Sequence, residues 1–419
     1  MRNWAGNHRY PTDRLHRPAS VEQVQELVAR APSVHVLGSR HSFTAIADAD
    51  ELVSLAPGPD GGLAADVEVD RDRGTVSCSG GLTYGQLAAP LEAAGLALHN
   101  LASLPHISVA GAVATATHGS GVGNGNLATA VAAVELVTSS GEVVRCARGD
   151  ADFGGVVVGL GALGVVARIT LDVQPAYEVR QRVFEDLPWA VLQDRFAEVL
   201  GSGYSVSVLT RLDSDSVDMV WVKSRTDGPP SPEGDLLGAR EATVPRHPIP
   251  GLDATAATAQ LGVPGPWAAR LPHFRMEFTP SNGDELQSEY LVPAEHGPAA
   301  LEAVRSLAPR LQPLLQVCEI RTVAADRLWL STAEGRDSVA FHFTWSPDQE
   351  AVEEVLAELE RALAPFEPRP HWGKVFCAGA DELAGRYERH ADFVALAQRL
   401  DPRGAFRNPW FERRVLGTR

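Results

Sequence analysis

Hydrophobic and polar positions repeat with two periods along the first third of the chain. Residues 19–31 show helical spacing of apolar side chains behind Ser20, a common helix-capping residue, and residues 84–96 show the same spacing up to Gly95. Residues 67–81, 131–149 and 165–173 alternate with period two and carry turn residues between runs, which predicts β-strands. With a short strand at 34–37, these elements predict an α+β domain over residues 1–175.

The pattern changes after Pro175. Residues 226–235 are rich in Pro, Gly and Asp, which predicts an exposed loop. From residue 288 the chain predicts a strand at 288–293, a helix at 300–311, strands at 315–323 and 338–345, and a helix at 349–366. This β-α-β-β-α order favours a split βαβ layer with an antiparallel sheet under helices. We therefore expect a second domain at 176–379 and a C-terminal segment, 380–419, that packs back on the first domain.

Composition and charge narrow the class of protein. The 419 residues are 44% hydrophobic and 21% charged, which is typical of folded proteins of two or three domains. The net charge of −16 argues against nucleic acid or an anionic membrane as a partner. Only two of the 37 basic residues are lysines, Lys223 and Lys374, so each is a candidate for chemistry that arginine does not perform.

Several signals point to the cytoplasm. The four cysteines lie far apart without CxxC or metal-ligand spacing, so we expect reduced and mostly buried thiols and no metal site. The first ten residues lack the apolar run of a signal peptide. The longest apolar run, 153–167, is shorter than the ~20 residues of a membrane span.

Two common hydrolase motifs are absent from the sequence. No HExxH zinc motif or GxSxG nucleophile motif is present.

The stretch VLGSRHSF, residues 36–43, places His41 directly after a strand and a Gly38-Ser39 turn. A histidine in such a turn lies either in a surface loop or against a ligand, and these eight residues alone leave both interpretations open. The stretch 101–126 is rich in glycine, small residues and hydroxyls and contains His118. Its backbone N–H groups suit a pyrophosphate. It matches neither dinucleotide fingerprint, so a Rossmann fold is not indicated, and a flexible loop remains the alternative to a ligand loop.

Two neighbouring strands carry charged residues on one face. In CEIRTV, Glu319 and Arg321 alternate with Cys318 and Ile320, and in VAFHFTW, His342 and Thr344 alternate with phenylalanines. If the strands pair, their polar side chains form one patch suited to vicinal hydroxyls. The alternative is the solvated face of an amphipathic sheet. Lys374 follows in RPHWGKVF, where it can stabilise an alkoxide or act as a base.

Taken in order, nine segments resemble the vanillyl-alcohol-oxidase type of flavoproteins and, within it, the alditol oxidases. They are NWAGN, VLGSRHSF, ASLPHISVAGAVATATHGSG, LGALGVV, ELQSEYLVP, CEIRTVAAD, HFTW, RPHWGKVF and DPRGAFRNP. They span nearly the whole chain. The resemblance implies a two-domain fold, with FAD bound by the first domain and an antiparallel-sheet cap domain that binds the substrate.

The resemblance also assigns residues to the cofactor. It implies that His41 is bonded to the 8α-methyl group of FAD. The sequence departs from the family pattern at Arg40, where a glycine is common. The extra side chain must point away from the flavin or contact its phosphates. The implied cofactor-binding residues are Gly38, Ser39, Arg40, His41, Ser42, Ser103, Ser108, Gly111, Thr115, Thr117, His118, Gly119 and Val166.

For the substrate, the resemblance implies binding of a polyol by Ser103, Glu319, Arg321, Thr344 and Lys374, with Glu319, Arg321, Lys374 and His342 as catalytic residues. The implied reaction oxidises the terminal hydroxyl of an alditol such as xylitol or sorbitol to the aldose and reduces O2 to H2O2. We expect a monomer. An aldonolactone oxidase or dehydrogenase of the same fold is the nearest alternative, and a non-catalytic sugar-binding protein is a more distant one.

Overall fold

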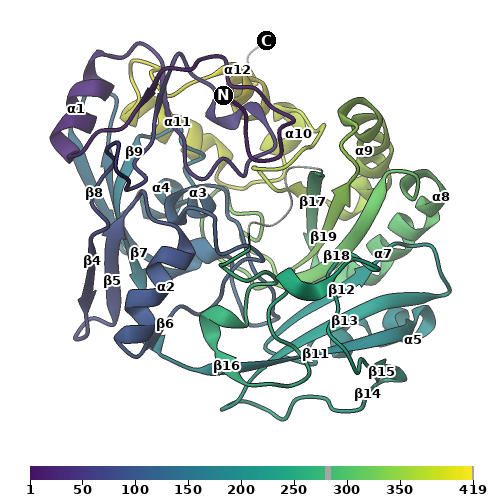
Figure 1. The fold of residues 1–419 in the computed structure, drawn as a ribbon. Helices are drawn as coiled ribbons and strands as arrows, with labels where there is room; N and C mark the ends of the chain where they lie inside the picture. Colours follow the sequence, from purple (N-terminus) through teal and green to yellow (C-terminus); the bar gives the residue numbers. More distant parts are fainter. Residues whose placement is uncertain (279–284, 418–419) are drawn as a thin grey trace.

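The computed structural model of the protein describes residues 1–278 and 285–417, so 279–284 of the expected second domain and 418–419 of the expected C-terminal segment lie outside the described residues. Two large sheets organise the molecule, one formed by residues 67–172 and one by residues 178–370 (Figure 1). In the described ranges no helix is both long and apolar enough to cross a lipid bilayer. The fold is α+β, as the sequence predicts.

The first part of the chain builds a five-stranded antiparallel sheet with helices around it. Its strands, in spatial order, are β4 (Val67–Asp70), β5 (Thr75–Ser79), β9 (Val165–Asp172), β7 (Val131–Val137) and β8 (Val143–Ala147). A small parallel sheet joins β1 (Leu15–His16), β3 (Glu51–Val53) and β2 (Val34–Val36), and β6 (Leu96–Ala97) pairs with β10 (Gln174–Pro175). The helices are α1 (Val21–Arg30), α2 (Tyr84–Ala93), α3 (Val109–Ala114) and α4 (Phe153–Val157).

Local signals in the sequence explain where these helices begin and end. The Ser20 side chain accepts a hydrogen bond from the Gln23 N–H and caps α1, as predicted. Thr83 and Gln86 form a reciprocal capping box at the start of α2. Gly95 follows α2 with a φ of +70°, a left-handed conformation that glycine adopts without strain. The predicted helices and hairpins of this part are therefore confirmed.

The second part builds a sheet that the structure describes as ten-stranded. Its spatial order is β14 (Asp235–Leu236), β15 (Ala239–Glu241), β11 (Glu178–Pro188), β13 (Ser216–Arg225), β12 (Ser205–Thr210), β18 (Leu315–Val323), β19 (Ser338–Trp345), β17 (Leu286–Pro293) and β20 (Arg369–Pro370), with β16 (Gly265–Pro266) beside β11. The sequence pattern predicts no element in residues 178–225, where β11, β12 and β13 lie. All six residues of β12 are buried, so this strand lacks the alternation that reveals a half-exposed strand.

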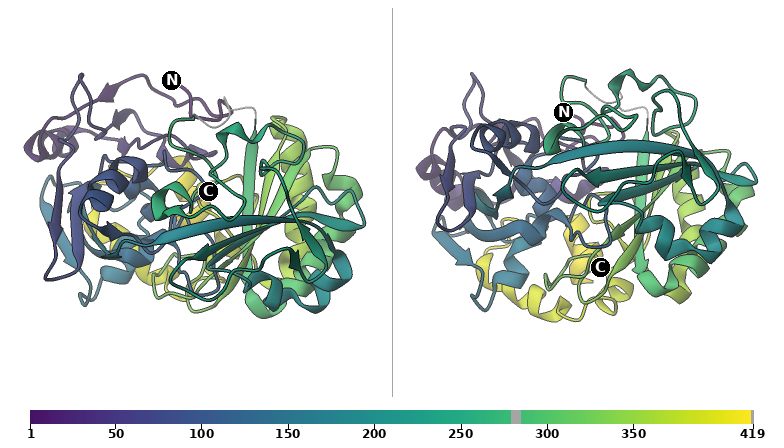
Figure 2. Two further views of the ribbon diagram at one scale, coloured as in Figure 1. Left: turned by 60° about the horizontal axis from the view of Figure 1, so that its bottom comes forward. Right: turned by 90° about the horizontal axis from the view of Figure 1, so that it is seen from below.

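Helices cover one face of the large sheet at its C-terminal strands. Strand β19 lies between β17 and β18 and is antiparallel to both, which confirms the predicted split βαβ order. Helices α7 (Gly297–Ser306), α8 (Ala308–Leu311) and α9 (Gln349–Leu363) lie beside these strands (Figures 1 and 2). Their Leu301 and Val352 share a buried cluster with Ile320 and Phe341. The opposite face of β17–β19 is free to carry polar side chains. The shorter α5 (Trp189–Asp194) and α6 (Phe196–Leu200) lie between β11 and β12 in sequence.

The C-terminal segment returns to the first part of the chain, as predicted. Helix α12 (Pro409–Phe411) contacts the short helix Ala45–Ala47, α11 (His390–Leu400) contacts α4, and α10 (Ala380–Ala384) packs on the last turn, Glu412–Leu416; all three lie in the upper part of Figure 1. The Val34 N–H donates to the Ala405 carbonyl at 2.8 Å, and the Asn408 amide donates to the Ile46 carbonyl at 3.0 Å. All four cysteines are unpaired, and three of them are buried, which confirms that the thiols are mostly buried.

Candidate active site

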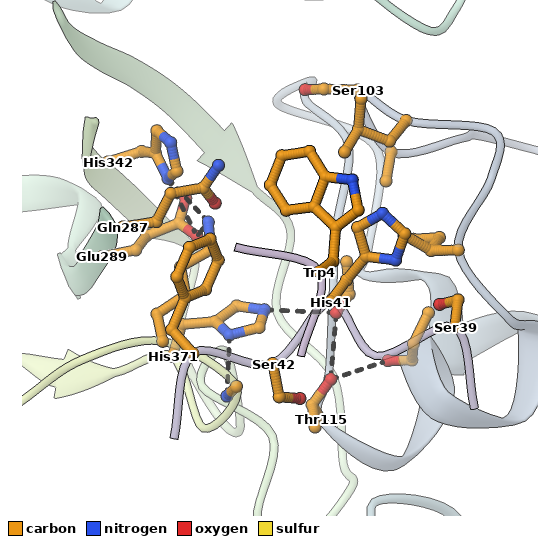
Figure 3. A pocket seen from close by; sticks show the side chains of 18 of the residues that line it. Trp4, Ser39, His41, Ser42, Ser103, Thr115, Gln287, Glu289, His342 and His371 are labelled. Atoms are coloured by element: carbon orange, nitrogen blue, oxygen red, sulfur yellow. Dashed lines mark hydrogen bonds and ion pairs between the residues drawn. The ribbon is translucent and has the colours of Figure 1, made fainter. Parts of the chain in front are cut away.

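A cavity of about 580 Å³ lies where the two parts of the chain meet, and residues of both line it. This volume is in the range of small-molecule sites. Residues 36–43 and 102–118 form one wall, and strands β17, β18 and β19 with the segment 371–374 form the other. Figure 3 shows the two walls, with Trp4, His41 and Ser103 on one side and Gln287, Glu289 and His342 on the other.

His41 lies in the first wall with both ring nitrogens buried and without a hydrogen-bond partner in the described residues. Its ring stacks on that of Trp4, with centroids 5.0 Å apart (Figure 3). Burial, aided by His106, lowers the pKa of His41 to about 4, so the imidazole is neutral at pH 7. Because the ring nitrogens are buried beside a cavity, His41 does not lie in a surface loop. A neutral ring with an unpaired nitrogen there is suited to bind a ligand.

The turn before His41 has a different geometry from the one its glycine suggests. The left-handed residue is Arg40, with a φ of +62°, and not Gly38. Gly38 gives space to a neighbour instead, because a Cβ there would lie 2.4 Å from the Ser108 Oγ and that side chain would have to move. The Arg40 guanidinium turns toward the N-terminal segment and donates to the Arg2 carbonyl at 3.4 Å. Because the Ser108 N–H donates to the Ser39 Oγ at 3.1 Å, the turn is fixed against the start of α3.

Most of the glycine-rich stretch 101–126 is buried or half-buried, its residues 102–118 belong to the first wall, and it contains α3, so the flexible-loop interpretation is excluded. A Cβ on Gly111 would lie 2.6 Å from the Ser108 Oγ. The Thr117 hydroxyl bonds to that of Thr115 at 3.0 Å and to the His371 Nε2 at 3.2 Å, which joins the two walls. Of the thirteen residues that the resemblance assigns to the cofactor, eleven line the cavity. The other two do not: Gly119 packs against Asn100 and Leu101, and Val166 lies within β9.

Three strands bring charged side chains into one row on the second wall. Glu319 of β18 lies opposite His342 of β19, which in turn lies opposite Glu289 of β17. Glu319 and Arg321 are each only 5% exposed, so this face is not the solvated face of an amphipathic sheet. Thr344, the next polar residue on β19, also lines the cavity. The predicted pairing of the two strands and the predicted polar patch are both confirmed.

Glu289 is the centre of this patch. Its carboxylate accepts from the Lys374 Nζ at 2.6 Å and from the Arg321 Nη2 at 2.7 Å, and the His118 Nε2 lies 3.2 Å away. Burial raises the pKa of Glu289, but Lys374, His118 and Arg321 outweigh burial and hold this pKa well below its usual range. The carboxylate is therefore ionised and holds two cations at the cavity.

The neighbours of Glu289 in the patch are a histidine, His342, and a lysine, Lys374. Burial, followed by the charge of Lys374, lowers the pKa of His342 to about 4, so its ring is neutral. The Lys374 Nζ lies 2.6 Å from the His342 Nδ1. Because that nitrogen accepts from the lysine, His342 carries its proton on Nε2, 3.3 Å from the Thr344 Oγ1. Burial lowers the pKa of Lys374 and Glu289 opposes this effect.

Arg321 contacts Ser103 of the first wall and Glu319 of its own strand. The Arg321 Nη1 lies 3.4 Å from the Ser103 Oγ and its Nε lies 3.7 Å from the Glu319 Oε1. The same Glu319 oxygen is 2.8 Å from the Nε2 of His273, whose Nδ1 is 3.0 Å from the Lys223 Nζ. Burial raises the pKa of Glu319, but Arg321 and His273 outweigh it and hold this pKa well below its usual range.

Sequence reasoning missed several residues of this cavity: Trp4, Gln287, Glu289, His273 and His371 all line it. A signal for two of them exists in the sequence. Gln287 and Glu289 lie on one face of β17 and alternate with Leu286, Ser288 and Tyr290, a weaker pattern than that of Glu319 and Arg321 on β18 because Ser288 is polar. His273 and His371 lie in loops, and no periodicity places them.

The first wall fits a flavin cofactor. Its glycines remove side-chain bulk at Gly38 and Gly111, its hydroxyl groups supply donors and acceptors, and His41 offers a buried nitrogen without a partner. The second wall offers carboxylates and hydroxyls that accept hydrogen bonds beside two cations that donate them, which suits a substrate with several hydroxyl groups. A redox cofactor on one wall and a hydroxylated substrate on the other can therefore face each other across the cavity.

Comparisons with known proteins agree with this division. An FAD binding domain model matches residues 12–147, and a D-arabinono-1,4-lactone oxidase model matches residues 281–414. The alditol oxidase of Streptomyces sp. is 52% identical over 413 residues, which covers 97% of this chain and 96% of the relative. The L-gulono-1,4-lactone dehydrogenase of Mycobacterium tuberculosis is 30% identical over 450 residues, covering 99% of this chain and 98% of the relative.

The fold also agrees with a solved structure. The crystal structure of cholesterol oxidase from B. sterolicum superimposes with a TM-score of 0.76 at 14% identity, covering 98% of this chain and 95% of that chain. Fold, cavity and relatives together define an FAD-dependent oxidoreductase with an FAD-binding domain and a second domain. The chain belongs to the vanillyl-alcohol-oxidase type of flavoproteins, in the group that contains alditol oxidase and the aldonolactone oxidases.

Proposed function

We propose that the protein oxidises the terminal hydroxyl of alditols such as xylitol and sorbitol to the aldose and reduces O2 to H2O2. The observation that carries the proposal is the buried row of Glu319, His342 and Glu289, which holds Arg321 and Lys374 at the cavity. Alternating acceptors and cations suit the successive hydroxyls of a linear polyol. The 52% identity with an alditol oxidase over nearly the whole chain supports the same substrate class.

The two large sheets support a division into two domains. We assign FAD binding to residues 1–175 with 380–419 and substrate binding to residues 176–379, because the two large sheets divide near Pro175 and the C-terminal helices return to the first part. We further propose that His41 bonds covalently to FAD, supported by its buried and unpartnered ring nitrogens. A location in the cytoplasm is consistent with the unpaired cysteines, and the monomer stays a prediction.

When bound, FAD supplies a hydride acceptor for the carbinol carbon and a route for the electrons to O2. The chain supplies orientation and charge. Ser103, Glu319 and Thr344 hold substrate hydroxyls, and Arg321 and Lys374 stabilise the alkoxide that forms when the reacting hydroxyl loses its proton. Glu289 keeps both cations in place, because it accepts from each of them. Neutral His342 accepts from Lys374 and directs its ammonium group to the cavity.

An aldonolactone substrate is the second candidate. The lactone oxidase model over residues 281–414 and the 30% identical lactone dehydrogenase favour it. A peroxide assay with xylitol, sorbitol and L-gulono-1,4-lactone separates the two, and dye reduction in place of peroxide indicates a dehydrogenase. Peroxide from the lactone alone would overturn the alditol proposal. A colourless protein that binds xylitol would instead indicate a sugar-binding protein.

The cofactor bond has its own test. We expect purified protein to be yellow and the colour to remain in the pellet after acid precipitation, because a covalent flavin is not released by unfolding. The His41→Ala variant should release its flavin into the supernatant. Release of the flavin from the wild type would contradict the bond but not the oxidase activity.

A further inference from the structure

Lys223 is the second lysine of the chain, and it does not line the cavity. It lies on β13, 1% exposed, behind the second wall. Its Nζ contacts three acceptors: the Leu271 carbonyl, the Pro272 carbonyl at 3.2 Å and the His273 Nδ1 at 3.0 Å. An ammonium group has three N–H donors, so the three acceptors match a protonated lysine.

These contacts determine which nitrogen of His273 carries the proton. Because Nδ1 accepts from Lys223, the neutral ring has its proton on Nε2. Burial, together with the charge of Lys223, lowers the pKa of His273 to about 4, so the ring is neutral at pH 7. The Nε2–H group then donates to the Glu319 Oε1 at 2.8 Å. The Glu319 Oε2 makes no hydrogen bond to any residue that the structure describes, which leaves it for a ligand.

We propose that Lys223 is a positioning residue for substrate binding: through His273 it holds the Glu319 carboxylate in the orientation that accepts an alditol hydroxyl. The inference rests on the proposed function, since it gives Glu319 a substrate hydroxyl to bind. Lys223 touches neither substrate nor cofactor. It acts by fixing a histidine tautomer, which in turn fixes a carboxylate.

The protonation state of Lys223 makes the orientation of Glu319 dependent on pH. Burial lowers the pKa of Lys223 to about 7, Glu319 raises it and Arg321 lowers it. Across the sheet, Lys223 lies opposite uncharged Gln181 on β11 and Ser205 on β12, and the loop at 271–273 adds only His273 and two carbonyl groups. A neutral amine has two N–H donors for three acceptors. Because the two carbonyls can only accept, we expect the two N–H groups to stay on them and the amine lone pair to face the His273 Nδ1. That lone pair favours a proton on Nδ1, so the Nε2–H bond to Glu319 is lost.

The test compares four variants by steady-state kinetics with xylitol between pH 5.5 and 9. In the wild type we expect kcat/KM to fall as the pH rises through about 7. Lys223→Met should raise KM by about tenfold at pH 6, the scale of one charge-assisted hydrogen bond, and should lack the step near pH 7. His273→Gln keeps an amide N–H for Glu319, so it should lack the step while KM stays within a few-fold of the wild type. Adding Lys223→Met to His273→Gln should then change KM no further.

Gln181→Met is the matched control, because Gln181 is also buried and pairs with Lys223 across the sheet without reaching His273. It should retain the pH step. The proposal is overturned if Lys223→Met keeps the pH profile of the wild type, or if Lys223→Met raises KM equally with and without His273→Gln.

A second measurement separates this proposal from the alditol proposal. Nitrogen chemical shifts of 15N-labelled histidine, assigned with the His273→Gln variant, report the tautomer without any substrate. We expect the Nε2–H form at pH 6 in the wild type and loss of a single tautomer in Lys223→Met. Absence of peroxide from every alditol would refute the proposed function, whereas an unchanged tautomer in Lys223→Met would refute the role of Lys223.

Discussion

The two walls of the cavity satisfy their polar groups in different ways. On the first wall, both ring nitrogens of His41 are buried without a partner in the described residues. On the second wall, the Glu289 carboxylate pairs with both Arg321 and Lys374, and His118 lies beside it. Because an unpaired buried polar group costs about 1–3 kcal/mol, the first wall is complete only with a ligand. The second wall is organised by its own charges before any substrate arrives.

The largest effect should follow from removing the central anion of the second wall. Glu289→Gln leaves two buried cations without their shared carboxylate, and breaking a buried ion pair costs about 3–5 kcal/mol. We expect flavin reduction by xylitol, measured by anaerobic stopped flow, to slow by at least ~10², and denaturant unfolding to show the lost stability. Glu360→Gln is the control, because that carboxylate accepts from Tyr290 and a backbone N–H and not from a cation. Similar losses in both variants would show that Glu289 has no special role.

The next effect concerns one cation of the same wall. Lys374→Met removes a donor that lies 2.6 Å from Glu289 and leaves that carboxylate paired with Arg321. Flavin reduction should slow by about 10², the usual scale for one electrostatic donor in an active site, while the flavin spectrum stays unchanged. Reduction of the variant at the rate of the wild type would remove Lys374 from the mechanism.

A smaller effect on stability should come from Lys223 behind the second wall. Its pKa falls from 10.5 to about 7 on burial. Below pH 7 the folded and unfolded chains both hold this proton, and between about 7 and 10.5 only the unfolded chain holds it. Unfolding then takes up a proton, so this group makes the fold more stable as the pH rises, by at most about 1.4 kcal/mol per pH unit.

Denaturant unfolding of the wild type and Lys223→Met between pH 6 and 10 measures this contribution. We expect the difference in unfolding free energy to shift in favour of the wild type only above pH 7. The same titration lowers kcat/KM in our proposal, so stability and activity should move in opposite directions over this range. A difference in unfolding free energy that does not change with pH would mean that Lys223 does not titrate there.

The sequence revealed the two walls unequally. The period-two alternation of Glu319 with Ile320 was sufficient to predict a polar face, because strand geometry alone decides which side chains share a face. Strand geometry also places Glu289 of β17 on a polar face. The importance of Glu289, however, depends on three partners from distant segments: His118, Arg321 and Lys374. No local pattern encodes such contacts. His273 and Lys223 belong to the same category, since a loop brings the histidine to a lysine fifty residues away in the chain.

On the first wall, motif matching found His41 but not the conformation of its turn. A glycine in the sequence suggested where the backbone turns, yet the left-handed residue is Arg40, and Gly38 is small because Ser108 packs against it. Steric requirements of this kind depend on a neighbour seventy positions away in the chain. Motifs therefore locate a ligand-binding turn more reliably than they describe its backbone.

The smallest predicted effect tests that turn directly. Arg40→Gly replaces a side chain that makes one long hydrogen bond, 3.4 Å to the Arg2 carbonyl, at a φ of +62°. A left-handed non-glycine residue costs roughly 1–2 kcal/mol, but glycine also gains freedom in the unfolded chain worth roughly 0.5–1 kcal/mol. The net change in unfolding free energy should be a stabilisation of no more than about 1.5 kcal/mol, and acid precipitation should still leave the flavin in the pellet. Destabilisation by several kcal/mol, or release of the flavin by acid, would show that Arg40 supports the first wall through contacts with the cofactor. The first wall would then depend on a charged side chain, as the second wall does.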